Sequence, residues 1–351
     1  MTVARIDLKN LTRSQLADRL PTLGLPAAAA SRVFAWLQRP GSHDLADLAT
    51  IKQEFRQRLA AQTVISRLEI AKREASRDGT TKYAFRLADD ALIESVLIPG
   101  NGRHTLCLSS QVGCAMGCRF CLTGGLGFKR NLLPAEMVGQ VLAVLAEMQD
   151  NGAAKINPRL LINNLVFMGM GEPLANYDHL LTALRILMDE QGLGFSERRV
   201  TVSTCGLVPK IHALGKDIRV NLAISLHGAD DTVRDLLMPV NQTWPLAELL
   251  AACRAYPLGN KRVIFIEYIL IKNINDSPRD AHRLAEILEG LPCRINLLPY
   301  NESATLPYER PDAATIEEFR AILARAGYRA LVRQSRGADI QAACGQLAGQ
   351  G

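Results

Sequence analysis

The chain has 351 residues, of which 48% are hydrophobic and 22% are charged, and its formal net charge is +6 at pH 7. This composition is typical of a soluble protein with one large core and an appendage, and the lack of any run of about 18 apolar residues excludes a membrane-spanning helix. Eight cysteines, with no apolar secretory segment among the first residues, predict a cytoplasmic protein with metal or redox chemistry instead of disulfides.

The first 75 residues are predicted to form short helices separated by proline and glycine. Apolar residues recur at helical spacing after Thr12, over Ala28–Leu37 and over Ile51–Leu59. This segment contains 12 Lys and Arg against 7 Asp and Glu. A basic helical unit suits a polyanionic partner, although a solvated helical face explains a modest basic bias equally well.

The pattern changes after residue 75, where short alternating segments predict strands. These segments are Tyr83–Leu87, Leu92–Ile98 and Thr105–Leu108, with turns at Asp89-Asp90 and Pro99–Gly102.

From residue 109 onward, predicted helices and strands alternate. The helices are Ala135–Met148, His179–Met188, Leu246–Tyr256, Ala281–Leu288 and Ile316–Ala326. The strands are Leu161–Phe167, Val200–Thr204, Val220–Ser225, Val263–Leu270, Arg294–Leu298 and Tyr328–Gln334. Repeated βα units predict a parallel sheet, open or closed into a barrel, with its site at the carboxyl ends of the strands.

Three cysteines share one short run with the spacing C-x3-C-x2-C: Cys114, Cys118 and Cys121. A structural zinc site has four ligands, and a [4Fe–4S] cluster normally takes four thiolates. Three thiolates therefore favour a cluster with one iron open to S-adenosylmethionine (SAM). The spacing, with Phe120 before the last cysteine, resembles the radical SAM signature. A partial zinc site and three buried thiols are the alternatives.

Polar residues that follow predicted strands are candidate ligands. In the run Gly169–Pro173, Gly171 lets the backbone approach a ligand closely, and Glu172 can hold an ammonium group. Further candidates, each of which alone is more often structural, are Ser203, Ser225, Leu226, His227 and Asn301.

Two cysteines outside the motif are also candidate functional residues. Cys107 lies seven residues before Cys114, too far away to belong to the same tight loop, and Cys344 lies in a tail of small residues. A thiol beside flexible glycines is available for alkylation or oxidation. Buried cysteines are usually inert, which is our interpretation of Cys205, Cys253 and Cys293.

Five segments in this order resemble the dual-specificity rRNA/tRNA adenine-C2 methyltransferases, the RlmN/Cfr family of radical SAM enzymes. They are Cys107–Cys114, Gly127–Leu132, Val166–Leu174, Ser225–His227 and Ala342–Leu347. The resemblance covers essentially the whole chain. It implies an α/β fold: a partial (β/α)6 radical SAM barrel with a small N-terminal helical domain and a short β extension. The implied domains are a helical RNA-binding domain at 1–75, the β extension at 76–108, and the radical SAM core with its catalytic-cysteine tail at 109–351.

The resemblance also implies a methyl relay that consumes two SAM molecules per turnover. Cys344 takes a methyl group from one SAM, and a second SAM, on a [4Fe–4S] cluster held by the three motif cysteines, supplies an adenosyl radical. Cys107 then resolves the protein–RNA adduct and leaves a transient Cys107–Cys344 disulfide. Glu94 matches the family's proton acceptor, and the sequence leaves open whether Glu94 or Cys107 removes the ring proton. The implied SAM contacts are Gly171, Glu172, Ser203, Ser225, Leu226, His227 and Asn301.

The implied substrates are 23S rRNA near the peptidyl-transferase centre and the adenosine 3′ of the anticodon in tRNAs. We expect a flavodoxin- or ferredoxin-type electron donor, a monomer and no membrane partner. Methylation of C8 of the same rRNA base, as in the antibiotic-resistance branch, uses the same cysteines and stays open, although Pro173 after Glu172 favours the C2 branch. The alternative from another class is a non-catalytic iron–sulfur or zinc protein that binds RNA.

Overall fold

A computed structural model describes residues 5–152, 158–259 and 261–349. Its centre is a ten-stranded sheet with the order β14-β13-β12-β11-β10-β9-β6-β5-β4-β3. From β6 through β14 successive strands of this order pair in parallel, whereas β6 pairs antiparallel with β5 on its other side. Because β3 and β14 form the two edges, the predicted parallel sheet is open. The parallel strands are β6 (Arg103–Cys107), β9 (Asn164–Phe167), β10 (Val200–Thr204), β11 (Asn221–Ser225), β12 (Ile264–Leu270), β13 (Cys293–Pro299) and β14 (Ala330–Val332).

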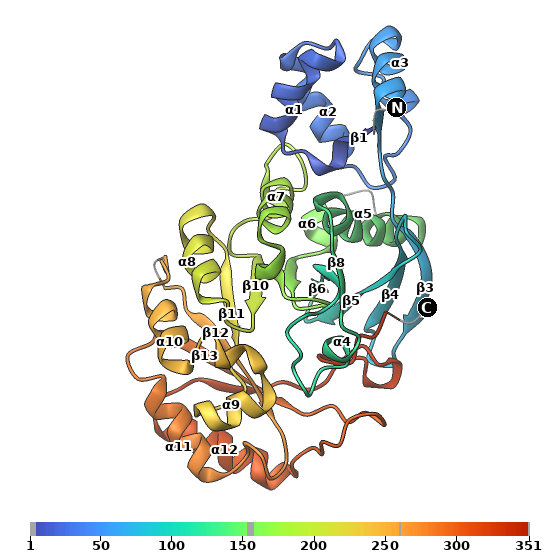
Figure 1. Ribbon diagram of the computed structural model, residues 1–351. Helices are drawn as coiled ribbons and strands as arrows, with labels where there is room; N and C mark the ends of the chain where they lie inside the picture. The colour runs from blue at the N-terminus through green and yellow to red at the C-terminus, as the bar shows by residue number, and fades with distance from the viewer. Residues whose placement is uncertain (1–4, 153–157, 260, 350–351) are drawn as a thin grey trace.

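Helices connect the parallel strands and cover the sheet (Figure 1). They are α5 (Pro134–Asp150), α6 (Pro158–Leu161), α7 (Tyr177–Met188), α8 (Val208–Asp217), α9 (Asp231–Leu237), α10 (Leu246–Ala255), α11 (Pro278–Ile287) and α12 (Ala313–Arg325). Their starts follow from local sequence: Ser277 and Asp280 form a capping box on α11, and Asp312 caps α12. The predicted helices are confirmed within a few residues. The strand expected from Leu161 starts only at Asn164, because α6 occupies the preceding residues.

Three antiparallel strands extend the sheet beyond β6. They are β3 (Glu69–Ala75), β4 (Thr81–Arg86) and β5 (Leu92–Gly100), and the strands expected after residue 75 are confirmed. The prediction of helices through residue 75 was wrong for β3. This edge strand is rich in exposed charges, which protect an edge against aggregation and also hide the alternation that marks a strand.

The N-terminal helices form a lobe at the top of Figure 1, above α5 and α7. They are α1 (Arg13–Arg19), α2 (Ala30–Leu37) and α3 (Gln53–Gln62), next to the small strands β1 (Ile6–Asp7) and β2 (Thr63–Val64). Leu16, Phe34 and Leu59 are fully buried in this lobe. Short 3-10 helices lie at Leu8–Asn10, Leu20–Leu23, Ala27–Ala29, Leu45–Asp47, Pro173–Asn176, Pro239–Gln242 and Ala338–Ile340. Within the described ranges, every helix is too short or too polar to cross a bilayer.

Candidate active site

The cysteine loop is closed at its base by a small antiparallel pair of strands. Gly113 has φ +73°, and a Cβ there would lie 1.8 Å from the carbonyl oxygen of Gly127, so the turn requires glycine. The amide of Cys114 donates to that same carbonyl at 3.0 Å, and the amide of Cys121 donates to the carbonyl of Cys118 at 3.1 Å. The loop is therefore folded back on itself. Its elements are β7 (Gln111–Gly113), α4 (Leu122–Gly125) and β8 (Phe128–Asn131).

The three motif thiols lie within electrostatic range of one another. Burial raises the pKa of Cys114 to about 11. Burial, followed by the proximity of Cys121 and Cys114, also raises the pKa of Cys118. Three thiolates in one loop suit a cluster with one open iron better than zinc, because a structural zinc site takes four ligands.

The glycine turn after β9 packs directly against the cysteine loop. Gly171 has φ +95°, and a Cβ there would lie 2.4 Å from the side chain of Gln111. The buried carboxylate of Glu172 accepts hydrogen bonds from the amides of Leu174 at 2.9 Å and Cys205 at 2.8 Å. Burial raises the pKa of this carboxyl group. Glu172 therefore joins the ends of β9 and β10, and the side chains of Thr204 and Cys205 also hydrogen-bond to it.

The candidates on β10 and β11 lie side by side because these strands are parallel neighbours. Ser203 is in β10, Ser225 ends β11, and His227 follows it with φ +58°. Nδ1 of His227 accepts from the amide of Ile269 at 3.1 Å. Burial, followed by the charge of Arg234, lowers the pKa of His227 to about 3. The ring is therefore neutral at pH 7, and the backbone of Glu267 also hydrogen-bonds to it.

The C-terminal tail lies beside α4 (Figure 1). The carbonyl of Gly345 accepts from the amide of Leu122 at 2.8 Å, so Cys344 lies at the cysteine loop. The side chain of Cys344 is exposed. Surrounding protein atoms nevertheless limit its hydration, and together with Glu267 and Cys121 they raise the pKa of Cys344 to about 11. Cys344 is thus an exposed residue whose sulfur is enclosed by neighbouring protein atoms.

The remaining candidates surround the tail. Cys107 ends β6 and is buried, and burial followed by the nearby Cys344 raises the pKa of its thiol. Both cysteines are free thiols. Nδ2 of Asn301 lies 3.5 Å from the carbonyl oxygen of Cys344. On β5, the buried carboxylate of Glu94 accepts hydrogen bonds from the tail backbone.

One buried residue of the site was absent from the sequence prediction. Arg234, on α9, is fully buried and donates to the carbonyls of Leu226 at 3.0 Å and Cys205 at 2.5 Å. It also donates to Oδ1 of Asn241 at 2.7 Å. Arg234 thus ties together the segments after β10 and β11. Its burial could not be predicted from the sequence, because an arginine with aspartates as neighbours is usually exposed to solvent.

Comparison with known proteins identifies the family. The radical SAM superfamily model matches residues 108–285. A curated protein from Desulfotalea psychrophila, described as dual-specificity RNA methyltransferase RlmN, is 49% identical over 344 residues, which are 98% of this chain and 95% of the relative. The chain belongs to the RlmN family of radical SAM enzymes.

Two further comparisons agree with the RlmN family. A protein from Geotalea uraniireducens with the same description is 46% identical, covering 99% of this chain and 97% of the relative. The crystal structure of a radical SAM methyltransferase from Sphaerobacter thermophilus has a TM-score of 0.90 and 41% identity, covering 98% of this chain and all of that one. The chain is therefore a radical SAM methyltransferase that uses a [4Fe–4S] cluster and SAM, and its predicted fold class is confirmed.

Proposed function

We propose that this enzyme methylates C2 of an adenosine in 23S rRNA near the peptidyl-transferase centre, and C2 of the adenosine 3′ of the anticodon in tRNAs. The RlmN relatives, described as dual-specificity RNA methyltransferases, support RNA as the substrate. The observation that carries the proposal is the docking of the tail. It brings Cys344 close to Cys121 of the cysteine loop and to Cys107 of β6.

The donor set fits the two cofactors. Cys114, Cys118 and Cys121 would hold the cluster, and the polar groups at the strand ends would hold SAM. When bound, the cluster and SAM would supply the methyl group and the radical that activates it. The candidate SAM contacts are Gly171, Glu172, Ser203, Ser225, Leu226, His227 and Asn301.

The two cysteines have different tasks in this proposal. The sulfur of Cys344 accepts a methyl group and carries its carbon to the adenine ring. Cys107, which is buried beside it, attacks the sulfur of Cys344 as a thiolate. The new S–S bond replaces the bond between that sulfur and the carbon on the base, and this carbon takes the electron pair and a proton to become the methyl group. A Cys107–Cys344 disulfide remains, and a thiol reductant must reduce it before the next turnover.

Glu94 and Cys107 are both candidate acceptors for the ring proton. Cys107 is already assigned the attack on the sulfur of Cys344, for which it must lose its own proton. We therefore favour Glu94, which lies next to the tail.

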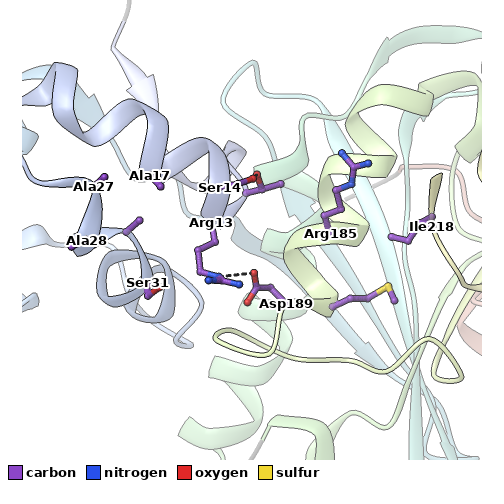
Figure 2. Close-up of a pocket in the computed structure, with 12 residues that line it drawn as sticks. Arg13, Ser14, Ala17, Ala27, Ala28, Ser31, Arg185, Asp189 and Ile218 are labelled. Carbon is purple, nitrogen blue, oxygen red and sulfur yellow. Dashed lines mark hydrogen bonds and ion pairs between the residues drawn. The ribbon is translucent and has the colours of Figure 1, made fainter.

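A groove between the N-terminal lobe and the core suits the RNA backbone. It has a volume of about 530 Å³, and Arg13, Ser14, Ser31 and Arg185 contribute polar groups to its lining. Arg13 and Ser14 come from α1, and Arg185 lies across the groove on α7 (Figure 2). Nε of Arg13 lies 2.9 Å from Oδ2 of Asp189, which holds α1 against the end of α7. Guanidinium and hydroxyl groups are common phosphate ligands in nucleic-acid complexes.

Arg185→Glu should weaken tRNA binding and make it less sensitive to salt. Loss of one phosphate contact reduces the slope of log K against log salt by about 1, which filter binding at several salt concentrations will measure. Arg325→Glu is the matched control, because this exposed arginine lies at the end of α12, a helix that Figure 1 shows far from α1 and α7. An equal loss in both variants would mean that the groove does not contact RNA.

The test of the proposed function is a product analysis. The reconstituted enzyme is incubated anaerobically with unmodified 23S rRNA or tRNA, and the nucleosides are identified by mass spectrometry. We expect 2-methyladenosine. 8-Methyladenosine would assign the enzyme to the resistance branch, and SAM cleavage without either product would mean a different substrate. We further propose a flavodoxin- or ferredoxin-type reductant, a monomeric state and a cytoplasmic location.

A further inference from the structure

The C-terminal tail is fixed to the body of the protein on more than one side. Near its start, Asp78 in the turn between β3 and β4 accepts from the amide of Gly337 at 3.1 Å. Beyond Cys344, the hydroxyl of Thr123 donates to the carbonyl of Leu347 at 2.6 Å. The side chain of Leu347 is buried. Cys344 therefore lies in a segment that is anchored both before and after it.

The last described contact of the tail is with Glu94. Oε2 of this carboxylate accepts from the amide of Ala348 at 2.9 Å and from the amide of Gly349 at 3.1 Å. Oε1 lies 3.6 Å from Nζ of Lys82, and the two side chains are only 2% and 9% exposed. A carboxylate removed from water requires such donors. The tail therefore provides two hydrogen bonds that Glu94 would otherwise lack.

We propose that Glu94 is the latch that holds the catalytic tail in place and thereby positions Cys344 at the cysteine loop. This inference rests on the proposed function in one respect, namely that Cys344 carries the methyl group. The geometry of the latch is independent of that role. Hydrogen bonds to a charged acceptor are stronger than those between neutral groups, so a single buried carboxylate can order a short tail of small residues.

The latch limits when Glu94 can act as a base. An oxygen of a carboxylate has two lone pairs, and both lone pairs of Oε2 accept tail amides while Lys82 faces Oε1. Oε2 can accept the ring proton only after the residues beyond Cys344 have moved away, and a proton delivered to Oε1 would face the ammonium group of Lys82 at 3.6 Å. Binding of the target base would then open the latch and free the acceptor in one step. If Cys107 accepts the proton instead, the latch can remain closed throughout.

Hydrogen exchange of the tail amides in the full-length, reconstituted protein tests the latch. Glu94→Ala should accelerate exchange at Ala348 and Gly349 at least about tenfold, because it removes a charged acceptor. Glu94→Gln keeps an acceptor oxygen and should preserve most of the protection. Ala348→Pro removes one donor without changing Glu94, and Ala348→Gly is its matched control because it keeps the amide.

A second readout is the amount of S-methylcysteine at Cys344, measured by peptide mass spectrometry. We expect it to fall in Glu94→Ala and Ala348→Pro and to persist in Glu94→Gln and Ala348→Gly. Glu94→Gln should still lose the RNA product, because an amide cannot accept the ring proton.

Wild-type exchange rates in Glu94→Ala, or equal methylation in Ala348→Pro and Ala348→Gly, would overturn the latch. If Glu94 controls tail exchange but the wild-type enzyme never methylates Cys344, the latch stands and the proposed relay fails. Exchange within α5 shows whether each variant is folded.

Discussion

Cys344→Ala is expected to abolish methylation of adenosine, with a loss of at least about 1,000-fold, as for removal of a covalent catalytic group. The docked tail puts this sulfur within electrostatic range of Cys121 and Cys107, and alanine cannot carry a methyl group to the base. The cluster should survive, because Cys344 lies outside the cysteine loop. Nucleoside mass spectrometry of the RNA, iron analysis and an assay of SAM cleavage measure the three quantities.

Cys293→Ala is the matched control for this experiment. Cys293 starts β13, so it lies at the amino end of the sheet, opposite the site. Its removal should leave methylation, iron content and SAM cleavage unchanged. Undiminished 2-methyladenosine from Cys344→Ala would contradict the relay, because the methyl group would then reach the base without this sulfur.

The sequence predicted the features that depend on short-range patterns. The spacing of Cys114, Cys118 and Cys121 is local, and so is the glycine turn around Gly171. The sequence alone therefore predicts a cluster-binding loop and a ligand-binding turn at these positions. Alternating βα segments repeat over most of the chain. For β10, the first and last residues predicted from the sequence are those of the observed strand. The strand ends then placed Ser203 and Ser225 at one edge of the sheet.

The features that sequence reasoning missed depend on long-range contacts. Glu94 and Ala348 are 254 positions apart, and nothing in either segment indicates that one accepts a hydrogen bond from the other. Arg234 lies in a charged run that looks solvated, yet it becomes buried because its guanidinium group satisfies acceptors from three segments. Such contacts arise only when the tertiary structure brings the segments together.

Cys118→Ala is expected to eliminate the cluster. Two thiolates would remain in the loop, and a [4Fe–4S] cluster with an open iron needs three. The absorbance band of the cluster and the bound iron should disappear, and SAM cleavage should fall more than about 100-fold. The loop should keep its backbone contacts, because the carbonyl of Cys118 still accepts from the amide of Cys121 in the variant.

Cys205 provides the matched control because it is a buried thiol beside the same site. Burial, followed by Glu172 and Cys118, raises the pKa of Cys205, which shows how near it lies. Cys205→Ala retains the backbone amide that donates to Glu172 and should keep its cluster and its SAM cleavage. Loss of iron from Cys205→Ala would make Cys205 a fourth ligand. Every iron would then have a protein thiolate, and SAM could not bind the cluster in the way that the three-cysteine loop predicts.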